Sequence, residues 1–179
     1  TLPLVVDVSR LDGLRGISLD GDRLRVGGAV TYLELRKDAR VAARCPLLAA
    51  MARDVGALQI QARGTLAGNL ASGSPAADGV SALAALDATL LLRSIRGARR
   101  VPLSGFYTGY RRSVLAADEL IEAVGGALPP AGAPLGWRKD GNPPAQATPQ
   151  VATPGRPALV DGREGGPGPR GGDAAASAA

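Results

Sequence analysis

The sequence Gly64-Thr65-Leu66-Ala67-Gly68-Asn69 places two glycines, a hydroxyl group and a carboxamide within six residues. Glycine tolerates backbone angles that other residues avoid and lets a ligand approach the main chain closely, so successive N–H groups can converge on an anion. The side chains of Thr65 and Asn69 add donors and acceptors at the two ends. An ordinary turn is the alternative, because glycine-containing loops are common. With Asp78 following nine residues after Asn69, the pattern predicts an anion-binding loop flanked by a carboxylate.

The segment before this loop has the pattern of an amphipathic helix. Pro46 suits the first position of a helix, and Gly56 suits its end. Four apolar residues fall on one face at helical spacing: Leu47, Leu48, Met51 and Val55. We interpret these mainly as core residues, so the helix would hold the following loop against the core.

Short strands and short helices alternate through the first 126 residues. Asp20-Gly21-Asp22 lies between two alternating apolar segments and predicts a β-hairpin, while Thr31 and Glu34 form a capping-box pattern that starts a helix. Further elements are expected as β-rich runs at 4–8, 89–92, 99–101 and 115–124, helices at 41–44 and 80–86, and a surface loop or short helix at 106–110. This order predicts an α+β domain and not a doubly wound parallel sheet.

The composition of the chain excludes several kinds of catalytic and metal-binding site. The chain has 179 residues, no histidine and one cysteine, Cys45. These counts exclude a histidine-based triad, histidine-ligated zinc, an internal disulfide and a cysteine-ligated iron–sulfur cluster carried by this chain alone. A bound cofactor that brings its own reactivity is therefore the economical source of chemistry. No apolar run is long enough to span a bilayer and the first residues do not resemble a signal peptide, so we expect a soluble, cytoplasmic protein.

The net charge of +5 raises the question of nucleic-acid binding. The positive charges are almost all arginines, they are dispersed along the chain, and few aromatic residues are available for base stacking. We interpret them as a solvated or partner-facing surface. A basic nucleic-acid binder is kept as an alternative that would show strongly salt-dependent binding.

The character of the sequence changes after Gly125. Prolines at 129, 130 and 134 mark a linker, and the chain beyond Val151 is rich in Pro, Gly and Ala with few large apolar residues. Such a composition buries too little apolar surface to offset the entropy of ordering. We therefore expect a domain at 1–126, a linker and the start of a C-terminal subdomain at 127–151, and a disordered tail at 152–179.

Several motifs recur in the order and spacing of one known family. They are Pro46-Leu47-Leu48, Gln59 through Asn69, Ser74-Pro75-Ala76-Ala77-Asp78, Ala85-Leu86-Asp87-Ala88, Val101-Pro102-Leu103 and Gly109-Tyr110-Arg111-Arg112. Across about a hundred residues this resembles the flavin-binding domain of the xanthine dehydrogenase and carbon monoxide dehydrogenase family of molybdenum hydroxylases. The resemblance implies an FAD domain of the p-cresol methylhydroxylase or vanillyl-alcohol oxidase type, with a mixed or antiparallel sheet flanked by helices.

The resemblance also implies which residues contact the cofactor. Gly64, Thr65, Leu66, Ala67, Gly68 and Asn69 would line the diphosphate and ribityl side of FAD, mainly through backbone N–H groups. Asp78 would accept hydrogen bonds from hydroxyl groups of the cofactor or fix the loop, with a helix cap as its alternative role. Val55 and Ile121 match positions that pack on the flavin nucleotide. Lys139 matches a basic position near it, with a solvated surface as its alternative. No catalytic acid or base and no metal ligand is implied.

The sequence departs from the family pattern in four places. An earlier glycine-rich loop that holds the other side of the diphosphate is missing and the C-terminal subdomain is cut short, so the fold is expected to be incomplete at both ends. Ala62 stands where the family usually has Asn, and Ala67 where it usually has Gly, whose replacement would narrow the approach to the phosphate. We therefore expect weak or absent retention of FAD when this chain is purified by itself, so that it would not be yellow with stoichiometric flavin.

Two functional hypotheses follow from the resemblance. In the first, the chain is the FAD-binding subunit of a molybdopterin-dependent dehydrogenase. It would work with a molybdopterin-binding large subunit and an iron–sulfur subunit, and pass electrons through FAD to NAD or another acceptor. In the second, it is a non-catalytic remnant or interaction module that keeps the scaffold and has lost most FAD binding.

Overall fold

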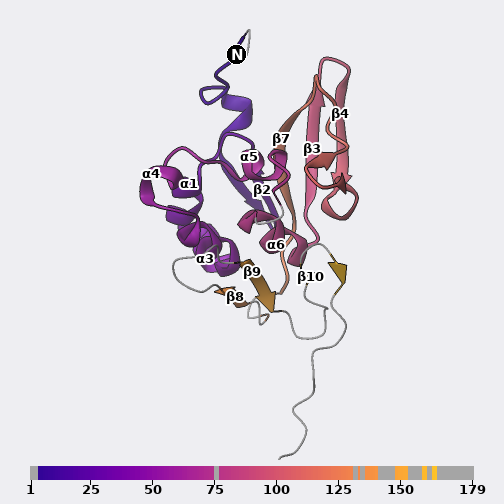
Figure 1. Cartoon of the computed structure of the whole chain (residues 1–179). Coiled ribbons are helices and arrows are strands. Elements are labelled where there is room, and N and C mark those ends of the chain that lie inside the picture. The colour runs from indigo at the N-terminus through magenta and orange to yellow at the C-terminus, as the bar shows by residue number, and fades with distance from the viewer. Residues whose placement is uncertain are drawn as a thin grey trace, which may run out of the picture.

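A five-stranded antiparallel sheet forms the centre of the protein. The computed structural model describes residues 4–74, 77–130, 133, 136–140, 148–152, 159–160 and 163–164. The strands follow the order β1-β2-β7-β3-β4, so the hairpin at each edge is joined through the central strand β7 (Figure 1). Their bounds are β1 (Ile17–Asp20), β2 (Arg23–Gly27), β7 (Leu120–Ala127), β3 (Thr89–Ser94) and β4 (Gly97–Pro102). The predicted α+β class is confirmed.

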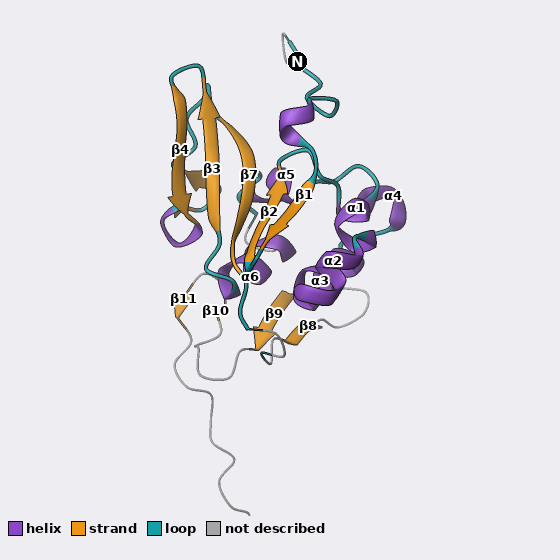
Figure 2. Ribbon diagram, turned by 180° about the vertical axis from the view of Figure 1, so that it is seen from behind, coloured by secondary structure: helices purple, strands orange, loops and turns teal. Residues whose placement is uncertain are grey.

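The helices of the described residues form a second layer. They are α1 (Tyr32–Lys37), α2 (Ala39–Arg44), α3 (Pro46–Asp54), α4 (Leu58–Gln61), α5 (Leu66–Ala71) and α6 (Asp78–Ala85). Helices α5 and α6 lie across one face of the sheet, in front of it in Figure 1 and behind it in Figure 2. Helices α1 to α4 continue this layer beyond the β1–β2 edge.

Local sequence signals explain where two of these helices begin. The predicted capping box of α1 is formed, because Thr31 Oγ1 accepts a hydrogen bond from the backbone N–H of Glu34 and the Glu34 carboxylate accepts one from the N–H of Thr31. Helix α3 begins at Pro46, whose missing N–H costs nothing at a helix start. The chain turns after α3 at Gly56, which has a φ of +49°.

The core lies between the sheet and the helices. Along the central strands, Val26 and Leu90 both pair with Val124, and all three side chains are buried. Residues on the same face of a sheet alternate along each strand, so this register aligns the apolar positions of β2, β7 and β3 toward one side. Leu48 and Met51 of α3 are fully buried in the same apolar cluster, as the helical spacing predicted.

Three local expectations differ from the structure. The β-rich run at 4–8 forms no strand, because a strand needs a neighbour for its backbone groups and this segment is exposed. The segment 106–110 was expected to be a loop or short helix. It contains β5 (Tyr107–Gly109), which follows the 3-10 helix η2 (Leu103–Gly105) and pairs with β6 (Arg112–Ser113). The strand expected at 115–124 begins only at Leu120.

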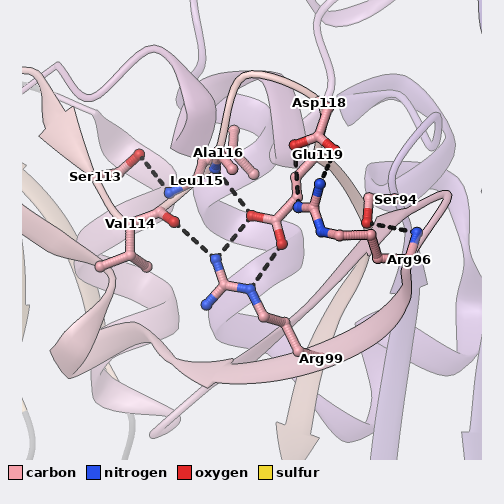
Figure 3. A network of polar contacts seen from close by, with 9 residues as sticks. All are labelled: Ser94, Arg96, Arg99, Ser113, Val114, Leu115, Ala116, Asp118 and Glu119. Carbon is pink, nitrogen blue, oxygen red and sulfur yellow. Dashed lines mark hydrogen bonds and ion pairs between the residues drawn. The ribbon is translucent and has the colours of Figure 1, made fainter.

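Ion pairs hold the loop before β7 against the edge strand β4 (Figure 3). The Glu119 carboxylate accepts hydrogen bonds from Nε and Nη2 of Arg99, both at 2.7 Å, and from the backbone N–H of Ala116 at 2.9 Å. Arg96 forms a second ion pair with Asp118. The hydrogen bonds from Arg99, followed by that from Ala116, lower the pKa of Glu119 to about 2. This network explains why the strand starts late, since residues 116–119 are bent into a turn to reach the arginines.

A separate hairpin follows the sheet domain. Strands β8 (Gly136–Asp140) and β9 (Thr148–Ala152) are antiparallel, and Nε1 of Trp137 donates a hydrogen bond to Oδ2 of Asp54 at 2.7 Å. The hairpin is thereby attached to the end of α3. Two short strands, β10 (Leu159–Val160) and β11 (Arg163–Glu164), fall within the segment 152–179 that was expected to be a disordered tail. Ala152 ends β9, and the other residues of that segment lie outside the described residues.

Two adjacent glycines of β7 provide a matched pair of substitutions that tests the register of the sheet. A Cβ on Gly125 would overlap the carbonyl oxygen of Leu24, whereas a Cβ on Gly126 would lie at ordinary contact distance, 3.5 Å, from the Cα of Ala88. We expect Gly125→Ala to lower the free energy of unfolding by about 3 kcal/mol. Gly126→Ala should leave it unchanged or raise it by about 0.5 kcal/mol, because alanine restricts the unfolded chain. Urea unfolding of both variants measures this, and equal stabilities would contradict the register.

The Glu119 network predicts a defined acid dependence of stability. Because the folded-state pKa of Glu119 lies near 2, below the ordinary 4.5, its contribution is complete above pH 4.5 and is lost as the pH falls toward 2. We expect Glu119→Gln to be less stable than the wild type at pH 6, and the difference to shrink steadily below pH 4.5. Urea unfolding between pH 3 and 7 measures it, with Asp20→Asn on the exposed end of β1 as the charge-matched control. A difference that stays constant over this range would refute the role of the carboxylate.

Candidate functional site

Both backbone polar groups of Gly64 form hydrogen bonds within the chain. Its N–H donates a hydrogen bond to the carbonyl of Ile60 at 2.7 Å, and its carbonyl accepts one from the N–H of Tyr32 at 3.0 Å. A Cβ at this position would lie 3.0 Å from the Ile60 oxygen and 3.3 Å from the ring of Tyr32. The need for glycine at position 64 is therefore explained by close packing between α4 and α1.

The second half of the stretch is the beginning of a helix. Thr65 is the N-cap of α5, and its Oγ1 accepts a hydrogen bond from the N–H of Gly68 at 3.0 Å. The N–H of Asn69 donates to the carbonyl of Thr65 at 3.0 Å. Three amides of the stretch, those of Gly64, Gly68 and Asn69, thus donate within the chain. The segment expected to be an open glycine loop is a capped first helical turn, because the Thr65 hydroxyl satisfies the helix start.

Side chains in the middle of this stretch point into the core. Leu66 is 1% exposed and Ala67 is 6% exposed, and both belong to the apolar cluster. The methyl group of Ala67 therefore lies in the interior and does not narrow the outer surface. Gly68 is exposed, while Gly64, Thr65 and Asn69 are half-buried, so these four residues form the accessible part of the stretch.

Asn69 connects this stretch to the start of α6. Its Oδ1 accepts a hydrogen bond from the backbone N–H of Gly79 at 3.1 Å. Asp78, the first residue of α6, is 8% exposed, and the residue at the N-cap, Ala77, makes no side-chain cap. The carboxylate of Asp78 lies in the first helical turn, where the helix dipole favours a negative charge. The structure thus joins Asn69 to Gly79, the residue that follows Asp78.

Sequence analysis missed Tyr32. Its ring packs on Gly64, and its hydroxyl lies 3.6 Å from the place where a Cβ on Gly79 would stand. Tyr32 is 2% exposed, and burial, followed by the negative charge of Asp78, raises the pKa of its hydroxyl. The only local signal was its position directly after the capping Thr31, and this does not reveal what a side chain contacts.

The other predicted site residues lie on three different elements. Val55 is half-buried directly after α3, and Ile121 is buried in β7. Lys139 is on β8, which lies below the sheet in both views, whereas α5 lies beside the middle of it (Figures 1 and 2). The structure therefore groups residues 64–69 with Asp78 and leaves the strand that carries Lys139 away from them.

A hollow elsewhere in the molecule has no polar lining. It lies between the sheet, α3 and α6 and is lined by Leu24, Val26, Leu48, Leu83, Leu86, Ala88, Val124, Gly125, Gly126, Ala127 and Leu128. No charged side chain lines it. Recognition of a charged cofactor needs polar groups, so this hollow is not the site that the sequence predicts.

Neither a group of metal ligands nor a membrane-spanning helix is found in the described part of the chain. No group of three or more His, Cys, Asp or Glu residues there is arranged to hold a metal ion. Among the same residues, no helix combines the length and apolar character needed to cross a membrane.

This chain belongs to the family of FAD-binding domains of molybdopterin dehydrogenases, whose sequence profile matches residues 1–129. The family resemblance seen in the sequence motifs is confirmed, and FAD is the cofactor of the family. The chain is 36% identical over 124 residues to the nicotinate dehydrogenase FAD-subunit of Eubacterium barkeri, covering 68% of this chain and 42% of that protein. It is 38% identical over 120 residues to the xanthine dehydrogenase FAD-binding subunit of Escherichia coli O157:H7, covering 66% and 41%.

Solved structures of the same family have the same fold. A chain of carbon monoxide dehydrogenase from Hydrogenophaga pseudoflava superposes with a TM-score of 0.73 at 28% identity, covering 81% of this chain and 52% of that chain. A chain of quinoline 2-oxidoreductase from Pseudomonas putida 86 gives 0.70 at 29% identity, covering 78% and 48%. The present chain therefore spans about half the length of these structures and about two fifths of the curated relatives.

The groups around α5 fit the chemistry of FAD. The cofactor presents a negatively charged diphosphate and several hydroxyl groups. The Thr65 hydroxyl at the start of α5 and the side-chain NH2 group of Asn69, whose Oδ1 accepts from Gly79, are donors on half-buried residues, and the buried Asp78 supplies a carboxylate that can accept from hydroxyl groups. Donors for the diphosphate and an acceptor for the hydroxyl groups are thus present on neighbouring helices.

The cap of α5 gives a direct test of this local structure. Thr65→Ala removes the acceptor for the Gly68 N–H and is expected to lower the free energy of unfolding by about 1 kcal/mol. Thr65→Ser keeps a hydroxyl and should retain most of the stability. Urea unfolding compares the two variants with the wild type. If both variants matched the wild type, Thr65 would not be capping α5.

Proposed function

We propose that this chain is the FAD-binding part of a molybdopterin-dependent dehydrogenase and passes electrons from iron–sulfur clusters through FAD to NAD or another acceptor. The proposal is supported by membership of the family and by relatives named as FAD subunits of dehydrogenases. The structural observation that carries it is the hydrogen bond from Gly79 to Asn69, which joins α5 to the first turn of α6, where Asp78 lies.

In this proposal the chain binds and orients the cofactor, and FAD supplies the redox chemistry when bound. Thr65, Gly68 and Asn69 hold the diphosphate and ribityl side, with Gly64 and the backbone of Leu66 and Ala67 shaping the same surface. Asp78 accepts hydrogen bonds from hydroxyl groups of the cofactor. Val55 and Ile121 as packing positions, and Lys139 as a nearby cation, stay proposals based on the family pattern. The proposal requires no side chain to act as a general acid or base, and the chain contains no histidine.

Electrons must reach this flavin from another protein or domain. Cys45 is the only cysteine of the 179 residues, it is 1% exposed, and burial raises the pKa of its thiol. One buried thiol cannot ligate an iron–sulfur cluster. We therefore propose an iron–sulfur subunit and a molybdopterin-binding large subunit as partners. Relatives named as a medium chain and as FAD subunits support a multi-subunit assembly.

One structural feature favours a second candidate. Three amides of the stretch 64–69 already donate within the chain, and the side chains of Leu66 and Ala67 are buried. A scaffold that satisfies its own polar groups in this way is also suited to an interaction module with little FAD affinity. The two candidates are separated by titrating the chain with FAD, since the interaction module would show no saturable binding.

Replacing Asn69 by aspartate tests the site without removing its structural bond. Asn69→Asp keeps an oxygen to accept from the Gly79 N–H and places a negative charge where the diphosphate is proposed to bind. We expect the affinity for FAD to fall at least about tenfold, because like charges at short range repel strongly. The measurement is a flavin-fluorescence titration at fixed ionic strength.

The control for this substitution is Gln59→Glu, which makes the same amide-to-carboxylate change on the exposed surface of α4. Its affinity for FAD should stay within about twofold of the wild type, because solvent and salt screen exposed charges. Equal affinities for the wild type and Asn69→Asp would remove Asn69 from the site. Wild-type protein that binds no FAD would favour the interaction module.

A further inference from the structure

We propose that Tyr32 is a positioning residue of the FAD site, which holds Gly64 at a fixed distance from the start of α6 and directs its hydroxyl toward the Asp78 carboxylate. This inference rests on the proposed function. It concerns a residue on a helix that the sequence motifs do not include, and it explains how two separate segments of the site are kept together.

The backbone and ring of Tyr32 both contact the glycine stretch. Its N–H donates a hydrogen bond to the Gly64 carbonyl at 3.0 Å, beside an antiparallel bridge between Thr31 and Thr65. Two ring atoms, Cδ2 and Cε2, would lie 3.3 and 3.5 Å from a Cβ on Gly64. Because Gly64 carries no side chain, the aromatic ring can lie directly against the backbone of the stretch.

The other end of the same side chain reaches α6. The Tyr32 hydroxyl lies 3.6 Å from the Cβ position of Gly79, and that position is only 2.7 Å from Oδ1 of Asn69. Gly79 follows Asp78 directly, and the Asp78 charge raises the pKa of the Tyr32 hydroxyl, second in effect to burial. One rigid side chain therefore spans from Gly64 to the helix that carries the proposed hydroxyl-binding carboxylate.

The Tyr32 hydroxyl is buried, and it makes no hydrogen bond to any of the residues that the structure describes. A buried hydroxyl without a partner destabilises a fold, and phenylalanine would fill the same space without this cost. The hydroxyl thus costs folding stability, and the charge of Asp78 acts on it. We infer that it forms its hydrogen bond when the cofactor is bound, by donating to the carboxylate and orienting it toward the hydroxyl groups of FAD.

The test compares the buried Tyr32 with the half-buried Tyr107 in the full 179-residue chain. Tyr32→Phe keeps the ring on Gly64 and removes only the hydroxyl. Tyr107→Phe is the matched control, because the Tyr107 hydroxyl donates to the carbonyl of Leu70 at 2.8 Å. Each variant is examined for thermal unfolding without flavin and for FAD affinity by fluorescence titration, alongside the wild type and Asn69→Asp.

We expect the two variants to change in opposite ways. Tyr32→Phe should unfold at the same temperature as the wild type or a few degrees higher, while its dissociation constant for FAD rises about tenfold from loss of one charge-assisted hydrogen bond. Tyr107→Phe should unfold about 4 °C lower because it loses a formed hydrogen bond, with FAD affinity within about twofold of the wild type. A purely structural hydroxyl could not separate affinity from stability in this way.

Each other outcome identifies which idea fails. If Tyr32→Phe lowers the unfolding temperature as Tyr107→Phe does, the hydroxyl has a structural partner and the positioning role is overturned. If Asn69→Asp weakens FAD binding and Tyr32→Phe does not, the positioning role of Tyr32 fails while the proposed site stands. If the wild type itself binds no FAD, both the proposed function and the role of Tyr32 fail.

Discussion

The contact between Tyr32 and Gly64 is the constraint on which the arrangement of the helical layer depends. A backbone hydrogen bond joins the first turn of α1 to the residue before the N-cap of α5, and the aromatic ring then occupies the space that a side chain at position 64 would need. The position of α1 therefore fixes the residue at which helix α5 begins. From there Asn69 reaches the N–H of Gly79, and the start of α6 is fixed in turn.

The sheet provides the rigid support for this chain of contacts. Strand β7 pairs with both β2 and β3, so it links two hairpins that are distant in sequence into one antiparallel surface. Gly125 lies so close to the carbonyl of Leu24 that no side chain fits between the strands. The helices pack on an apolar surface that is continuous across β2, β7 and β3. This packing fixes the positions of α5 and α6, which carry the proposed site.

The structure shows how glycines can be required by the fold and still line a ligand surface. At Gly64 and Gly79, the neighbouring Tyr32, Ile60, Leu66 and Asn69 leave little room for a Cβ. The same close packing brings main-chain groups and the Asn69 and Asp78 side chains near one another at neighbouring helix starts. Membership of the FAD-binding family is therefore compatible with a stretch whose amides are in part used internally, because the Thr65 hydroxyl and the side-chain amide of Asn69 can still act as donors.

The sequence by itself determined the elements whose causes are local. The Asp20-Gly21-Asp22 turn, the capping box of Thr31 and Glu34, and the spacing of apolar residues after Pro46 each act within a few residues, and each formed as expected. The family motifs also identified the FAD-binding family, because their order along the chain is a property of sequence. Only the tertiary structure decided that residues 4–8 form no strand, that the glycine stretch begins a helix, and that Tyr32 spans the site. Those outcomes depend on which distant residues become neighbours, and burial and backbone pairing between them are properties of the folded chain alone.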